Sequence, residues 1–193
     1  MKAVQRAITF AFELPDRSSY ASWAPLPLRL IVGYGFMEHG FAKLARGSDS
    51  FAIILHALGV PAPHLMAWAT IAIEVLGGLA MTLGALVPLV SAPMAAVLVV
   101  AMFTAHWPYG FSSIKLLAVT SAGAQFGPPG YETDLLYLAC IVALVLGGPG
   151  PLSVDGAFRR QIARHKKSKS FSIPPRSASG VVDGYVPRSA NRR

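Results

Sequence analysis

Five ionisable side chains lie within or at the ends of apolar stretches of this chain, where charge is costly to bury. In chain order they are Arg29, His39, Lys43, Glu74 and His106. A carboxylate, two imidazoles and two cations can pair with one another, move protons or bind a polar ligand. Ionisable residues inside a membrane are functional unusually often, so these five are the candidate site.

The helical spacing of these residues predicts which of them meet. On an ideal helix, Arg29 and Lys43 share a face with Gly40, while Glu74 shares a stripe with Gly77 and Gly78. Glycines permit close helix contact, so we expect Glu74 to meet Arg29 or Lys43 across two neighbouring helices. Such a pair either fixes helix packing alone or also lines a ligand site, and the spacing leaves both interpretations open.

The histidines are less clearly assigned. His106 stands beside Trp107 and Tyr109, where an aromatic belt at a membrane interface is expected, and His39 lies near the middle of a helix. Two histidines on different helices could ligate a haem, but nothing in their spacing requires one, and we do not expect haem. A single cysteine, Cys140, excludes a thiolate-rich metal site, and we expect no metal. The chain contains no nucleotide-binding or hydrolase motif that would name a reaction.

These residues must be positioned by membrane helices. Hydrophobic residues make up 53% of the 193-residue chain and charged residues 13%, too few for an ordinary soluble enzyme. Residues 75–114 contain no Asp, Glu, Lys or Arg, and these 40 residues are enough for about two crossings of about 20 residues each. With two further apolar segments, we predict an all-α fold, an integral membrane four-helix bundle with helices near 27–45, 65–86, 89–107 and 132–148.

Charge divides the chain into a neutral body and a basic tail. Residues 1–158 carry seven Lys/Arg and eight Asp/Glu, whereas residues 159–193 carry ten Lys/Arg and one acid. We therefore expect an N-terminal cytoplasmic or interfacial segment (1–26), a membrane domain (27–156) and a basic interfacial helix followed by a disordered tail (157–193). The cations from Arg159 to Lys169 are expected to bind anionic lipids, not nucleic acid. The positive-inside rule places both termini in the cytoplasm.

The order of these features resembles the DoxX family of small bacterial inner-membrane proteins. Five short patterns carry the resemblance over residues 27–156: an Arg with a His-Gly…Lys-Leu block, a Glu…Gly-Gly, an aromatic-flanked His, an acid before the last helix, and a Gly-x-Gly…Ser-x-Asp ending. Glu38 is not part of the pattern. The matching residues, in the same order, are Arg29, His39, Gly40, Lys43 and Leu44; Glu74, Gly77 and Gly78; His106; Glu132; and Gly148, Gly150, Ser153 and Asp155.

The resemblance implies a four-helix bundle in the bacterial inner membrane and suggests a redox role. Some relatives resemble subunits of thiosulfate:quinone oxidoreductase, so it implies a redox-associated subunit that exchanges electrons with quinone, together with a partner protein. In that case, Glu74 and one of His39 and His106 would contact the quinone oxygens beside glycine-lined helices. The alternative is a non-enzymatic assembly or binding subunit whose buried ion pair is structural.

Overall fold

The computed structural model describes residues 21–171, with side chains as far as residue 165. Most of the expected N-terminal segment and the expected disordered tail from residue 172 onward lie outside the described residues. The described part is mainly helical. The expectation of an all-α fold therefore holds for it apart from one two-stranded sheet between the last two apolar helices.

A short helix joins the first two long helices, in a segment where the sequence analysis predicted no helix. α3 runs over Pro25–Arg46 and ends at Gly47, whose φ of 90° favours glycine. α4 (Ser48–Ala57) follows, and then α5 (Pro63–Ala72) continues through the π-helical turn η1 (Ile73–Gly77) into α6 (Gly78–Leu83). A helix forms here because residues 48–57 are mostly apolar, and its ten residues bury Ala52 and Leu55 against Ala67.

The hairpin connects the next two long helices in the chain. α7 (Val87–Ala101) continues through the π-helical turn η2 (Met102–His106) and the short 3-10 helix η3 (Trp107–Tyr109). The antiparallel strands β1 (Leu116–Thr120) and β2 (Gly123–Phe126) come next, followed by α8 (Glu132–Gly147). The final described helix, α9, covers Val154–Phe171.

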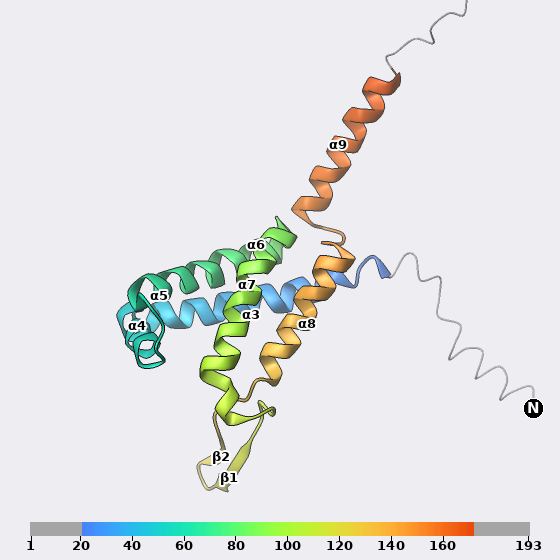
Figure 1. Ribbon diagram of the computed structural model, residues 1–193. Coiled ribbons are helices and arrows are strands. Elements are labelled where there is room, and N and C mark those ends of the chain that lie inside the picture. The colour runs from blue at the N-terminus through green and yellow to red at the C-terminus, as the bar shows by residue number, and fades with distance from the viewer. Residues whose placement is uncertain (1–20, 172–193) are drawn as a thin grey trace, which may run out of the picture. The chain divides into compact units, whose positions relative to one another are not determined.

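The helices pack as two antiparallel pairs that cross one another. α3 lies beside the α5–α6 helix, and α7 lies beside α8 (Figure 1). The core forms where the pairs meet, from Val32 and Phe36 of α3, Met81 of α6, Met94 of α7 and Leu144 of α8. The two pairs do not run parallel to each other, and the integral membrane four-helix bundle stays a prediction.

Two helices of the described part are long and apolar enough to cross a membrane. These are Pro63–Leu83, with a mean hydropathy of 1.6, and Val87–Tyr109, with a mean hydropathy of 2.1. Their outward faces carry large apolar side chains such as Leu76 and Leu89, each about two-thirds exposed. A soluble protein hides such side chains, whereas lipid covers them without cost.

Candidate functional site

Lys43 and Glu74 form an ion pair across the contact between α3 and η1. The Lys43 Nζ atom lies 2.6 Å from both carboxylate oxygens of Glu74. The Glu74 side chain is 7% exposed and that of Lys43 is 22% exposed. The ring of Phe51 on α4 lies 5.1 Å from the same nitrogen. Of the two cations expected near Glu74, the structure gives it Lys43, and each charge is compensated by the other.

Glycines bring the two helices close enough for this pair. A Cβ added at Gly40 would lie 2.6 Å from Cγ2 of Val75, and one added at Gly78 would lie 2.6 Å from the carbonyl oxygen of Gly33. A Cβ at Gly77 would approach the Met94 side chain of α7 to 3.2 Å. The glycine faces are therefore covered by neighbouring helices, as in close small-residue packing between membrane helices.

Arg29 lies at the other end of α3 and does not meet Glu74. It is fully buried, and its Nη2 atom donates to the carbonyl oxygens of Pro151 at 3.1 Å and Leu152 at 3.3 Å. Its Nη1 atom packs against Gly84, where an added Cβ would overlap it. Gly84 also has a φ of 64°, which ends α6 in a conformation that favours glycine. Arg29 thus fastens the loop before α9 to the end of α6.

The rest of the Gly-x-Gly…Ser-x-Asp segment completes this fastening. The Asp155 carboxylate accepts hydrogen bonds from the backbone N–H groups of Leu86 (2.8 Å) and Val87 (3.1 Å). These groups open α7, so Asp155 supplies the missing N-terminal cap from a distant part of the chain. The Ser153 hydroxyl donates to the Gly150 carbonyl oxygen at 2.7 Å and accepts from the N–H of Gly156 at 3.1 Å. We call Arg29, Gly84, Ser153 and Asp155 the Arg29 clasp.

His106 is paired with a carboxylate that the sequence analysis did not identify. Its Nδ1 atom lies 2.6 Å from an oxygen of Asp134, in the first turn of α8. The Asp134 side chain is 6% exposed, whereas that of His106 is 31% exposed. An imidazole held by a buried carboxylate keeps a fixed orientation and one ring nitrogen free for a further contact.

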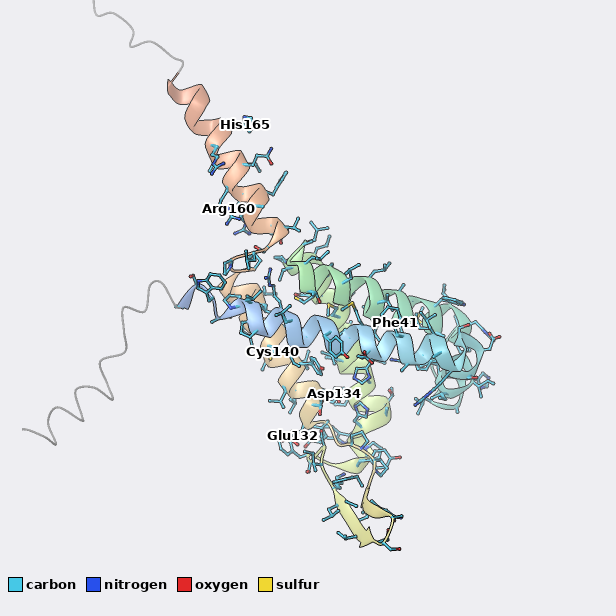
Figure 2. The ribbon with its side chains drawn as sticks, turned by 180° about the vertical axis from the view of Figure 1, so that it is seen from behind. Phe41, Glu132, Asp134, Cys140, Arg160 and His165 are labelled. Atoms are coloured by element: carbon cyan, nitrogen blue, oxygen red, sulfur yellow. The ribbon has the colours of Figure 1, made fainter. Side chains whose placement is uncertain are left out.

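An aromatic cluster stands beside this pair, made of Phe103, Trp107, Phe111 and Tyr131. The rings of Trp107 and Tyr131 stack with centroids 5.1 Å apart and planes 19° from parallel. Phe103 contacts Trp107 at 5.4 Å, and Phe111 meets Tyr131 edge-on at 5.7 Å. Figure 2 shows Glu132 and Asp134 at the hairpin end of α8. The pair and the rings therefore share one end of the α7–α8 helix pair.

Glu132 has a different role from its neighbour Asp134. Its carboxylate accepts a hydrogen bond of 3.0 Å from the N–H of Ser113, at the base of the hairpin. The sequence analysis named Glu132 as the acid before the last helix and passed over Asp134. Their positions were the available signal. Both acids lie in the first turn of a helix that packs antiparallel to the helix carrying His106, and only one of the two can face that helix.

The other candidate residues are not part of a shared site. His39 and Glu38 are exposed on α3, and the described residues give His39 no hydrogen-bond partner. His56 and His64 lie on α4 and α5 and line a cavity of about 190 Å³ with Ala52, Ile53 and Pro63. Within residues 21–171, no three His, Cys, Asp or Glu side chains are grouped to hold a metal ion.

Comparison with known proteins agrees with the resemblance. Residues 24–107 match the model of the DoxX family, the family that the sequence patterns resemble. The matched span contains α3 to η2, and with them Lys43, Glu74 and His106. No curated protein and no solved structure matches the chain.

Proposed function

We propose that this membrane protein of the DoxX family is a redox-associated subunit that exchanges electrons with quinone, together with a partner protein. The His106–Asp134 pair carries the proposal, since reduction of a quinone to a quinol consumes two electrons and two protons. In this proposal the electrons come from the partner protein or from a bound cofactor. The protons need an acid–base side chain within reach of the quinone oxygens, and imidazole is the side chain that most often has this task.

In this proposal each member of the pair has its own task. With Asp134 ionised, the Nδ1–H group of His106 donates to it, and Nε2 is left to exchange a proton with a quinone oxygen. Burial of Asp134 excludes water from the inner side of the pair, while the partial exposure of His106 lets a ligand approach from the outer side. The stacked rings of Trp107 and Tyr131 offer an aromatic surface next to it.

The position of the pair suits a lipid-soluble substrate. His106 ends one of the two helices that are long and apolar enough to cross a membrane, so the pair lies where the helix reaches an interface. A quinone dissolved in the bilayer can reach that depth, and protons from the adjacent aqueous side can reach the imidazole. We place the protein in the bacterial inner membrane as a multi-pass protein with both termini in the cytoplasm, following the charge bias of its tail.

A second function is favoured by the other polar residues. Lys43 and Glu74 satisfy one another, Arg29 fastens a loop, and the glycine faces between them are filled by neighbouring helices. These contacts support a non-enzymatic membrane assembly or binding subunit whose buried ion pair is structural. On this view His106 and Asp134 also only join α7 to α8.

The exposed face of α9 supports lipid binding under either function. Phe158 and Ile162 are exposed beside Arg159, Arg160 and Arg164, an arrangement that fits the surface of an anionic leaflet. We propose that the cations from Arg159 to Lys169 bind anionic lipids. Binding of a 155–170 peptide to vesicles should rise with anionic lipid content and fall with added salt. Equal binding to neutral vesicles would contradict this proposal.

The decisive experiment is purification in mild detergent and chromatography of the bound lipophilic molecules. We expect quinone in stoichiometric amount, reduced retention in Asp134→Asn and His106→Gln, and normal retention in Glu132→Gln. Glu132→Gln is the matched control because that acid lies two residues from Asp134 and bonds only the hairpin base in the structure. Each variant is first checked for an unchanged thermal unfolding midpoint. Stable Asp134→Asn protein that keeps its quinone would contradict the assignment, and quinone-free wild-type protein would favour the assembly role.

A further inference from the structure

The hairpin between α7 and α8 has one continuous apolar face. A β-bulge between Leu116 and Ala118 interrupts the regular alternation of side chains, so Leu116 and Val119 share a face with their cross-strand partners Phe126 and Ala124. All residues of both strands are exposed, with Leu117 70% and Val119 74% accessible. No part of the chain between residues 21 and 171 covers either face. Residues 116–131 contain no Asp, Glu, Lys or Arg.

The base of this hairpin is firmly held, so it is a built element and not a loose loop. The backbone N–H of Ser113 donates a hydrogen bond to the Glu132 carboxylate. The Ser113 hydroxyl donates to the carbonyl oxygen of Gly130 at 2.9 Å. The N–H of Gly130 donates to the Ser112 carbonyl oxygen at 3.0 Å. A Cβ at Gly130 would overlap the carbonyl oxygen of Gly110, so only glycine fits there. The apolar strands are therefore presented by a base that is itself well bonded.

Three surroundings can be compared for such a hairpin. Water is unfavourable, because contiguous exposed apolar surface of this kind is rare on soluble surfaces. The hydrocarbon core is also unfavourable, because a two-stranded sheet has two open edges whose N–H and C=O groups would find no partner there. A docked protein would cover the apolar face, but the hairpin follows a helix that is long and apolar enough to cross a membrane, which favours lipid as the covering surface. The headgroup region supplies hydrogen bonds to the strand edges and to the face of Thr120 and Gln125, and apolar contact to the other face.

The neighbouring residues indicate the same region. The hairpin follows Trp107 and Tyr109 and precedes Tyr131, and rings of this type gather where a membrane meets water. It also continues directly from the apolar helix Val87–Tyr109, whose end must lie near that boundary. We propose that residues 114–126 lie in the headgroup region of the bilayer, with Ile114, Leu117 and Val119 in contact with lipid. The proposal does not rest on the quinone function.

A fluorescent probe tests this placement in the full-length protein. Because Cys140 is the only cysteine, a Cys140→Ala background allows a single label at Val119→Cys or Ile114→Cys. The protein is placed in nanodiscs of phosphatidylcholine and phosphatidylglycerol and labelled with an environment-sensitive fluorophore. The control label is at Asp49→Cys on α4, where the side chain is 86% exposed. Unchanged thermal unfolding shows that each labelled protein is folded.

We expect blue-shifted emission from the two hairpin labels and loss of that emission with lipids that carry a nitroxide near the headgroup. Lipids with a nitroxide deep in the acyl chain should quench less, and the Asp49 label should show neither effect. Water-like emission at both hairpin positions would overturn the proposal. Blue-shifted emission that no spin-labelled lipid quenches would also overturn it, because the hairpin would then be covered by protein, such as a second copy of the chain.

Discussion

Replacing Glu74 with Gln should destabilise the protein by about 2–4 kcal/mol, because it leaves the Lys43 ammonium without a counter-charge. At an effective dielectric constant near 20, unit charges at the observed contact of 2.6 Å attract by about 6 kcal/mol. Desolvation of both ions offsets several kcal/mol of that attraction. The 22% exposure of Lys43 lets water relieve part of the loss, which lowers the estimate below that for a fully buried pair.

A double-mutant cycle separates the pair from its surroundings. Lys43→Met, Glu74→Met and the double variant are unfolded at equilibrium in mixed detergent micelles and followed by circular dichroism. Because the double variant has no unpaired charge, it should be more stable than the sum of the single losses predicts, with a coupling of about 1–3 kcal/mol. Glu38→Gln is the control, since that acid is exposed on the same helix and should change stability by less than about 0.5 kcal/mol. Additive single losses would refute the reasoning.

Three further predictions concern the contacts that shape the fold. Gly84→Ala should lower the free energy of unfolding by more than about 1 kcal/mol, because the new Cβ clashes with the Arg29 guanidinium and the residue keeps a strained positive φ. Gly59 also has a positive φ but open space around it, so Gly59→Ala measures the strain alone. Equal losses in the two variants would contradict the clash. Asp155→Ala should cost about 1–2 kcal/mol and speed hydrogen exchange at the start of α7, and unchanged exchange there would contradict the cap. Gly78→Ala should lower the free energy of unfolding by about 1–3 kcal/mol, because the added Cβ overpacks against α3. Gly147→Ala is the control, since a Cβ there meets nothing within 4 Å and should not destabilise the protein. Similar unfolding midpoints for the two variants would show that the contact at Gly78 is not tight.

The sequence was most informative about the long helices. Apolar runs bounded by glycine and proline predicted helices near 65–86 and 89–107, and the structure has continuous helices over Pro63–Leu83 and Val87–Tyr109. The reversal between them follows from Gly84, whose positive φ ends one helix. Helix periodicity and terminators act locally, so a single sequence is sufficient to find them.

Contacts between distant segments were harder to anticipate. The sequence offered Glu74 two cations on one face of α3, and only the relative shift of the helices selects Lys43. Arg29 donates hydrogen bonds to carbonyl oxygens more than 120 residues away in the sequence, and no local sequence pattern predicts such a contact. The short helix α4 and the hairpin were missed because short apolar segments have no distinguishing period. Asp134 was missed because the partner of a histidine depends on how two helices align.

The two carboxylate pairs differ in their partners and in their exposure. Both Glu74 and His106 lie in π-helical turns, which break the regular helix and are frequent at functional sites. At the first, Glu74 contacts Lys43 with both oxygens, and its side chain is only 7% exposed. At the second, Asp134 occupies only Nδ1 of His106, whose side chain is 31% exposed beside stacked aromatic rings. Under the proposed quinone function, a substrate oxygen would contact the second ring nitrogen of His106, so we propose that proton exchange takes place at the aromatic end of α7 and α8.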